Sequence, residues 1–289
     1  MLTVNRYCRE KFGEKLYKIS LNGGFSCPNR DGTLDTRGCI FCSAGGSGDF
    51  TPEAALPMED QISQAKQRVA EKFHGGRFIA YFQAFTNTYA PAEKLRELFE
   101  PVIKRDDVAV LSIATRPDCL GDDVLALLGE LNRIKPVWVE LGLQTIHEST
   151  AKYIRRGYEL NIYDDAVRKL NSIGLHVITH VILGLPGESV EDMLSTVRHV
   201  VNVGSGGIKL QLLHVLEKTD LAEDYRAGKF EALSLEAYIE ILKDCAEIIP
   251  EDMVVHRLTG DGPKKSLIAP LWSADKKKVI NAVNRALGL

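Results

Sequence analysis

The chain has 289 residues, of which 45% are hydrophobic and 26% charged, a composition typical of a folded globular protein with no sign of disorder. This length suits one α/β barrel-like domain with a small appendage, or two ordinary domains. No apolar run approaches the roughly 18 residues that a membrane-spanning helix needs. The first 18 residues carry charges throughout, unlike a signal peptide. The sequence therefore predicts a cytoplasmic protein without a membrane segment.

The formal net charge of −3 is unevenly distributed along the chain. From Val255 to the end, seven basic and two acidic residues give a local charge of +5, so the preceding 254 residues sum to −8. A basic tail on an acidic body points weakly to a polyanionic partner. The simpler interpretation is a solvated helix face around Lys276, Lys277 and Lys278.

Short β-branched apolar runs alternate with longer segments of helical period along the chain. In chain order, strands are expected at residues 17–21, 77–82, 108–114, 137–143, 176–183 and 207–213. Helices are expected between them at residues 52–73, 91–104, 121–134, 163–173 and 188–203. The strands are nearly continuous in apolar character, which is typical of parallel strands buried on both faces.

Repeated β–α units of this spacing predict a parallel sheet with right-handed crossovers. Six units are too few for a closed eight-stranded barrel, so we expect an α/β fold with a partial (β/α)6 barrel over residues 1–216. The pattern then changes to a helix at 234–249, a strand at 253–258, the loop TGDGPKKS and a helix at 274–287. We therefore expect residues 217–289 to form a small α+β extension packed on the barrel.

Three of the six cysteines, Cys27, Cys39 and Cys42, lie within the short segment CPNRDGTLDTRGCIFC. In a reducing compartment, clustered cysteines more often hold a metal or perform chemistry than form disulfides. The segment follows the first expected strand at its carboxyl end, where parallel barrels place their active sites. The remaining cysteines, at positions 8, 119 and 245, are scattered and are interpreted as small hydrophobic residues.

Three sulfur ligands suit zinc with a fourth ligand, or an iron–sulfur cluster with one iron left open. No histidine occurs between Met1 and Phe73, which disfavours a locally closed zinc site. A thioredoxin-like redox pair would leave Cys27 unexplained. We therefore favour a cluster with an open iron. Phe41, directly before the third cysteine, either shields the cluster from water or is an ordinary packing residue.

Three cysteines after the first strand of a partial barrel, with an aromatic residue before the third, resemble the radical S-adenosylmethionine (SAM) superfamily. The usual spacing there is C-x3-C-x2-C, whereas the eleven-residue first gap resembles the subgroup that contains the catalytic subunit of the eukaryotic Elongator complex. The string GGFSCPNRDGTLDTRGCIFC is similar to a bacterial branch of that subgroup, the YtqA/YhcC-like proteins. The resemblance implies a [4Fe-4S] cluster held by Cys27, Cys39 and Cys42, with SAM bound at the open iron.

The same resemblance implies that SAM is held by polar groups at the ends of successive strands. Gln144 is expected to contact the ribose, Arg156 the SAM carboxylate, His180 the ribose, and the turn at Gly184 the adenine. The further candidates are Gln83, Thr86 and Asn87 after the second strand, Ser112, Thr115, Arg116 and Asp118 at the third, and His214 at the sixth.

Each of these candidates also has a structural explanation. A Gln or Arg at the end of a strand is usually a surface or capping group, and Gly/Pro turns are common. His180 fits a satisfied core histidine equally well. Glu140 is interpreted as a buried ion-pair partner of Arg155 or Arg156. The combination at one edge of the sheet favours cofactor binding, and no catalytic residue is assigned.

The resemblance further implies reductive cleavage of SAM to a 5′-deoxyadenosyl radical, with a flavodoxin or ferredoxin as electron donor. The Elongator-like subgroup acts on wobble uridines of tRNA. The chain is too short to include the acetyltransferase domain of that relative, so acetyl transfer is not expected. We expect remodelling of an existing C5 side chain, for example 5-carboxymethylaminomethyl-uridine to 5-aminomethyl-uridine. The alternatives are a radical SAM enzyme that acts on a small molecule such as a tetrapyrrole, and a zinc-stabilised RNA-binding module.

Overall fold

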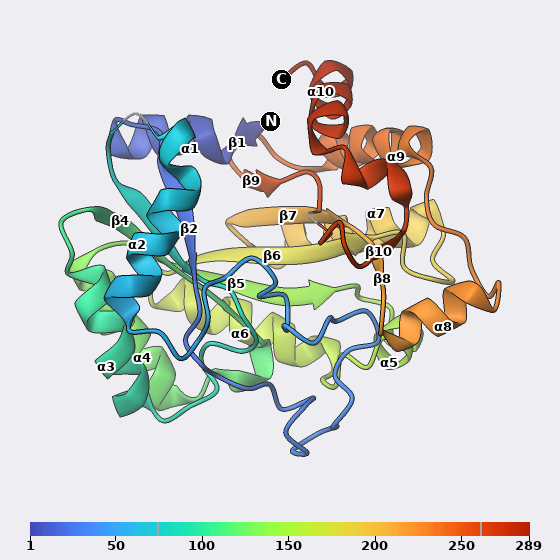
Figure 1. Cartoon of the computed structure of the whole chain (residues 1–289). Coiled ribbons are helices and arrows are strands. Elements are labelled where there is room, and N and C mark those ends of the chain that lie inside the picture. The colour runs from blue at the N-terminus through green and yellow to red at the C-terminus, as the bar shows by residue number, and fades with distance from the viewer. Residues whose placement is uncertain (74, 261) are drawn as a thin grey trace.

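The computed structural model describes residues 1–73, 75–260 and 262–289 (Figure 1). Its centre is an open eight-stranded sheet with the order β1-β9-β7-β6-β5-β4-β3-β2, in which every neighbouring pair is parallel. The six expected strands form its middle in chain order: β2 (Tyr17–Leu21), β3 (Phe78–Phe82), β4 (Val108–Thr115), β5 (Val137–Gln144), β6 (His176–Leu183) and β7 (Gly207–Leu212). The predicted partial parallel barrel is confirmed.

Two further strands extend this sheet beyond β7. The expected strand near residue 255, β9 (Val254–Arg257), pairs in parallel with β7, and β1 (Leu2–Thr3) pairs with β9. The chain after 216 therefore contributes a strand to the main sheet, and the division of domains after residue 216 stays a prediction. A separate antiparallel pair joins β8 (Val215–Leu216) to β10 (Leu267–Ala269). The expected loop TGDGPKKS includes residue 261, which lies outside the described residues.

Five helices alternate with the middle strands and cover the outer face of the sheet (Figure 1). They are α2 (Met58–Val69), α3 (Ala92–Ile103), α4 (Asp122–Ile134), α6 (Leu160–Ser172) and α7 (Val190–Asn202). The remaining helical elements are α1 (Val4–Phe12), α5 (Glu148–Tyr153), α8 (Asp220–Arg226), α9 (Leu235–Ile248), α10 (Lys276–Leu287), and the short 3-10 turns η1 (Ala70–Lys72), η2 (Pro117–Cys119) and η3 (Leu271–Ala274).

The helix expected at residues 52–73 begins later than its sequence suggests. Helix α2 runs over Met58–Val69, and Pro57 precedes it as the N-cap with φ −52° and ψ 146°. A proline disfavours the helical conformation at the residue before it, here Leu56. Residues 52–56 therefore belong to the long loop that follows β2.

The two faces of the sheet differ in chemistry. The outer face packs apolar side chains such as Val139, Leu141 and Leu143 against the helices. On the inner face, α1 closes the amino end of the half-barrel, where Cys8 packs with Trp138 in an apolar cluster. Further along, the inner face carries polar residues at every second position, so the expectation of strands apolar on both sides holds only for the outer face and this end. No helix among the described residues is long and apolar enough to span a bilayer.

Candidate functional site

The three clustered cysteines lie in the loop between β2 and α2, at the carboxyl edge of the sheet. The amide of Arg30 donates to the carbonyl of Cys27 at 2.8 Å, and the amide of Cys42 donates to that of Cys39 at 3.0 Å. Ile40 fastens the loop to the far side of the barrel, because its amide donates to Ile154 O at 3.2 Å and its carbonyl accepts from the amide of Leu221 at 3.1 Å. In Figure 1 the blue loop accordingly reaches α5 and α8.

The three thiols influence one another electrostatically. Burial is the main cause that raises the pKa of Cys39 to about 12, and the proximity of Cys42 and Cys27 raises it further. Burial also raises the pKa of Cys42, again with a contribution from Cys27, which the nearby Arg30 opposes. Each thiol therefore has the other two as neighbours, and the loop brings the three sulfurs into one region.

A cluster and a single metal ion require different spacings of their sulfur ligands. Among the described residues, no three His, Cys, Asp or Glu side chains are placed to hold one metal ion. A tetrahedral zinc site with Zn–S bonds of about 2.3 Å needs its sulfurs about 3.8 Å apart. In an iron–sulfur cubane each thiolate binds a different iron, so neighbouring sulfurs stand farther apart. Cys27, Cys39 and Cys42 are therefore candidate ligands of a cluster, each thiolate on a different iron.

Polar and positively charged groups surround the three thiols. Asn29 is 1% exposed, and its Nδ2 donates to Cys39 Sγ at 3.5 Å and to Arg155 O at 2.7 Å. The guanidinium of Arg116 is held by Asp118 in a bidentate ion pair of 2.9 and 2.7 Å. Burial alone would lower the pKa of Arg116, but Asp118 and then the Cys27 and Cys39 thiols raise it, so this cation lies beside the thiols.

The fourth cysteine of this region was not recognised from the sequence. Burial raises the pKa of Cys119 to about 12, and Cys27 is among the charges that act on it. Cys8 and Cys245 are buried in apolar surroundings, as expected of small hydrophobic residues. Cys119 differs, because it lies beside Asp118 and is partly exposed.

Arg156 is fully enclosed by its own loop. It is 2% exposed, its Nη1 donates to Thr145 O at 2.6 Å, and its Nε donates to Tyr158 O at 3.0 Å. Its Nη2 forms an ion pair with Glu148 at 3.0 Å. The guanidinium therefore holds together the segment that follows β5. Its expected contact with the SAM carboxylate stays a prediction.

Arg155 offers a donor that the protein leaves open. Its Nη2 pairs with Asp220 at 2.6 Å, whereas its Nη1 is buried with no hydrogen-bond partner in the structure. A buried donor without an acceptor is costly. Its backbone carbonyl contacts Asn29 in the cysteine loop, so a bound acceptor at this edge of the barrel would satisfy the open donor.

Two of the expected SAM contacts lie at the carboxyl ends of inner-face strands. Gln83 accepts from Ser20 Oγ at 3.0 Å and donates to Ser47 O at 2.7 Å. Gln144 has a positive φ of 66° at a bulge of β5. When its side-chain amide is turned so that the nitrogen faces carbonyl oxygens, this nitrogen donates to Gly142 O at 3.0 Å. Both are partly exposed at the edge where the cysteine loop lies.

Other sequence-predicted residues have structural roles in this conformation. Thr86 is buried, and Asn87 Nδ2 donates to three carbonyls that join β3 to β4. Phe41 packs on a small apolar cluster, and its expected role of shielding the iron–sulfur cluster from water stays a prediction. Gly184 has φ 89°, and an added Cβ would lie 2.9 Å from Leu233. The ring of His214 lies against Gly260 and Gly262.

An ionic cluster occupies the middle of the inner face. Glu140, which is fully buried, accepts from Lys18 Nζ at 2.8 Å and Ser112 Oγ at 2.7 Å on one oxygen. Its other oxygen contacts His180 Nε2 at 2.7 Å and the Lys209 ammonium. We call the group of Lys18, Tyr81, Ser112, Glu140, His180 and Lys209 the inner-face cluster.

This cluster corrects two expectations. The proposed partners of Glu140 were wrong, since Arg155 pairs with Asp220 and Arg156 with Glu148. His180 lies in the middle of β6 rather than at its end. Burial, followed by the charge of Lys209, lowers the pKa of His180 to about 4, so at neutral pH it is an uncharged hydrogen-bond donor to Glu140.

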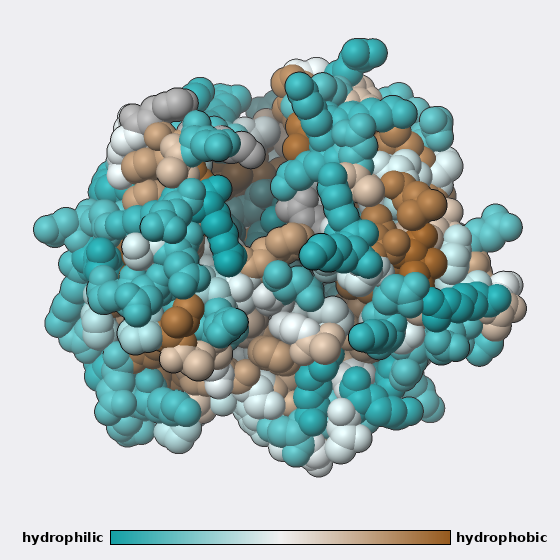
Figure 2. All heavy atoms as spheres, viewed as in Figure 1, coloured by the Kyte–Doolittle hydropathy of each residue, from teal (hydrophilic) through white to brown (hydrophobic). Residues whose placement is uncertain are grey.

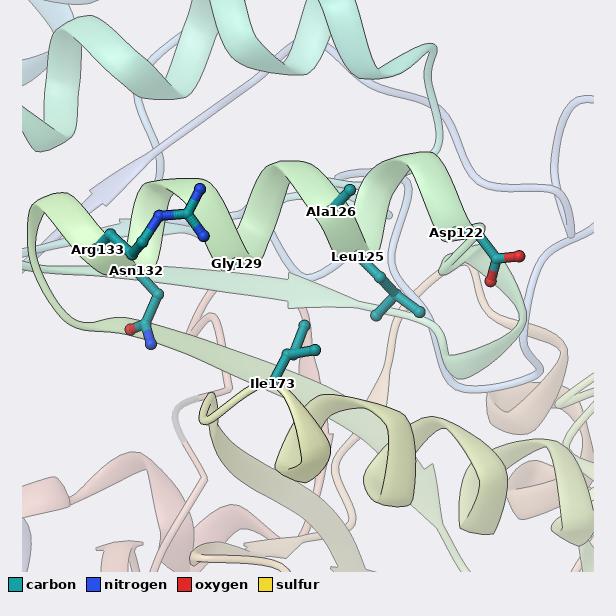
Figure 3. Close-up of a pocket in the computed structure, with 7 residues that line it drawn as sticks. All are labelled: Asp122, Leu125, Ala126, Gly129, Asn132, Arg133 and Ile173. Carbon is teal, nitrogen blue, oxygen red and sulfur yellow. The ribbon is translucent and has the colours of Figure 1, made fainter.

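A surface groove of about 530 Å³ lies elsewhere, between α4 and the turn after α6 (Figure 3). Its lining residues are Asp122, Leu125, Ala126, Gly129, Asn132, Arg133 and Ile173. The side chain of Asn132 is already bonded to Gly174 O and to the amide of Val137. The groove lies on the outer helical layer and includes none of the candidate residues.

Comparison with protein families agrees with this fold. Residues 36–200 match the radical SAM superfamily, and residues 206–288 match the Radical_SAM C-terminal domain. The chain therefore belongs to the radical SAM superfamily and is a radical SAM enzyme, whose cofactors are a [4Fe-4S] cluster and SAM.

Within this superfamily the chain is 50% identical to YtqA of Bacillus subtilis over 285 residues, which are 99% of this chain and 88% of that protein. It is 36% identical to YhcC of Escherichia coli over 267 residues, 92% and 85% of the two chains. It is also 27% identical over 161 residues to a tRNA uridine(34) acetyltransferase of Methanocaldococcus jannaschii, covering 55% of this chain and 29% of that protein.

The fold matches a solved structure of the archaeal Elp3 of Methanocaldococcus infernus with a TM-score of 0.66. The sequence identity is 18%, and the match covers 91% of this chain but 63% of that one. This likeness shows the shared fold, and the YtqA and YhcC relatives confirm the predicted branch of the superfamily.

Proposed function

We propose that the enzyme modifies the C5 side chain of a wobble uridine in tRNA, trimming 5-carboxymethylaminomethyl-uridine to 5-aminomethyl-uridine in the cytoplasm. The observation on which this proposal rests is the similarity to an enzyme named for uridine 34 of tRNA. The matched segment is 29% of that relative, so its acetyl transfer is not part of the proposal. Exposed basic residues near the carboxyl end support a polyanionic substrate: Lys264, Lys265, Lys277, Lys278 and Arg285.

The cysteine loop gives this proposal its chemical centre. Cys27, Cys39 and Cys42 would hold the cluster, while Gln83, Gln144 and Arg155 lie along the edge where SAM would bind. The bound cofactors would supply a 5′-deoxyadenosyl radical that removes a hydrogen atom from the methylene between the amine and the carboxylate. The substrate radical would then return one electron to give an imine, and water would hydrolyse the N–C bond of this imine to release 5-aminomethyl-uridine and glyoxylate. The chain's own residues orient SAM and the substrate and exclude water. A flavodoxin- or ferredoxin-type protein is the proposed electron donor.

Nucleoside analysis of tRNA tests this function directly. In a strain that lacks the gene, mass spectrometry should show accumulated 5-carboxymethylaminomethyl-uridine and a loss of 5-aminomethyl-uridine. A plasmid-borne wild-type copy should restore the profile, and a copy with Cys39→Ala should not. An unchanged profile of wobble uridines in the deletion strain would exclude the proposal.

The hydrogen bond from Asn29 to Cys39 should tune the cluster. An N–H donor to a ligating sulfur stabilises the reduced, more negative cluster and so raises its reduction potential. We expect Asn29→Leu to lower the potential by on the order of tens of millivolts. Redox titration followed by electron paramagnetic resonance measures the shift. Asn171→Leu, which removes an exposed donor to Gly204 O, is the matched control and should leave the potential unchanged.

A further inference from the structure

The inner-face cluster contains more positive than negative charge. The single carboxylate of Glu140 accepts four donors, two on each oxygen, and so has no room for a further cation. Two of those donors are ammonium groups, from Lys18 and Lys209. One carboxylate therefore faces two ammonium groups, of which that of Lys209 is buried, and a surplus of buried charge is costly.

The pKa of Lys209 reflects this excess of positive charge. Burial is the largest cause that lowers its pKa well below 10.5, and Lys18 and Arg257 lower it further. Glu140 alone acts in the opposite direction. The ring centroid of Tyr81 lies 4.2 Å from Lys18 Nζ and 4.6 Å from Lys209 Nζ. These cation–π contacts are weaker than an ion pair with a second carboxylate would be. A second anion would relieve the cluster.

The cluster lies where a bound molecule can reach it. It lies above the apolar cluster of α1 and Trp138, and below the strand ends where the cysteine loop runs. The side chains of Lys18 and His180 are 26% and 16% exposed, whereas Glu140 and Lys209 are inaccessible. Figure 2 shows that this face of the molecule is hollowed between α1 and α2 on one side and β9 and α10 on the other.

We propose that the inner-face cluster binds a carboxylate group of the substrate, with Lys18 as the donor that meets it. This inference rests on the proposed function, whose substrate ends in a carboxylate that the product lacks. Glu140 then acts as the positioning residue that holds the Lys18 ammonium over Tyr81, and Lys209 adds positive charge from below. A carboxylate matches the single accessible ammonium, whereas a backbone phosphate of tRNA is the competing source of negative charge.

Substrates with and without the carboxylate test the site. We expect the holoenzyme to bind tRNA with 5-carboxymethylaminomethyl-uridine about tenfold more tightly than tRNA with the methyl ester, the effect of one charged hydrogen bond. Lys18→Met should remove this preference by weakening only the carboxylate form. Lys18→Arg should retain most of it, and Lys15→Met, at an exposed position on the same segment, should retain all of it.

Equal weakening of both tRNAs by Lys18→Met, or no preference in the wild type, would overturn the carboxylate site. Ligand-observed NMR with N-methylglycine and with inorganic phosphate gives a result that does not depend on tRNA. Binding of N-methylglycine that Lys18→Met abolishes supports the site even if tRNA is not the substrate. Absent binding, or stronger binding of phosphate, rejects it. Unchanged circular dichroism shows that each variant is folded.

Discussion

Cys39→Ala is expected to abolish SAM cleavage and to empty the cluster site. Cys39 accepts a hydrogen bond from Asn29 and lies beside the cation of Arg116. Losing one of three thiolate ligands leaves an iron without a protein ligand, and the cofactor performs the chemistry. We expect dithionite-dependent SAM cleavage to fall at least about 1000-fold, or about 4 kcal/mol of barrier.

The measurement combines iron content, absorption near 400 nm and the formation of 5′-deoxyadenosine after anaerobic reconstitution. Cys245→Ala is the matched control, since this buried cysteine lies on α9 away from the loop, and it should keep both iron and activity. Cys119→Ala is a more demanding comparison, because Cys119 lies near Cys27. If Cys39→Ala retains about four irons per chain and cleaves SAM, the proposed ligand set is wrong.

The sequence predicted the middle of the fold because its physical cause is local. Each strand from β2 to β7 is an apolar run bounded by turn residues, and such runs are visible without tertiary information. The positions of β1 and β9 depend on long-range pairing instead. Leu2 pairs with Val254 across nearly the whole chain, and a two-residue strand has no periodicity to detect. Helix α8, with seven residues, escaped notice for the same reason.

The candidate site also has a part that could be predicted from the sequence and a part that could not. The cysteine loop could be recognised because its three sulfurs share one short segment. The inner-face cluster could not, because Lys18 and Lys209 meet Glu140 from 122 and 69 positions away. A signal was nevertheless present, since both lysines interrupt otherwise apolar strands. Alternating residues along YKISL and GIKLQL fall on opposite faces, so these charges indicated a polar inner face.

Glu140→Leu is expected to cost about 3–5 kcal/mol of unfolding free energy, because it leaves buried positive charge without a partner. Most of this cost comes from Lys209, whose side chain is 4% exposed, whereas Lys18 at 26% can turn toward water. Glu140→Leu combined with Lys209→Met should regain most of the loss, since apolar groups that replace both partners of a buried pair are often close to neutral. Urea denaturation under anaerobic conditions measures each value.

The exposed pair of Glu130 and Arg96 provides the control, because Glu130→Leu should cost less than about 1 kcal/mol.

The pH dependence of the unfolding free energy separates the effect of the Glu140 charge from that of its packing. Burial favours the protonated form of Glu140, but Lys18, Lys209 and His180 hold its pKa well below 4.5. Its stabilisation is therefore present at neutral pH and is lost as the pH falls below about 4.5 toward the folded pKa. The leucine variant lacks this component, so its stability should fall less steeply in acid than that of the wild type. Parallel acid curves for the two proteins would mean that Glu140 stabilises the barrel by filling space and not by its charge.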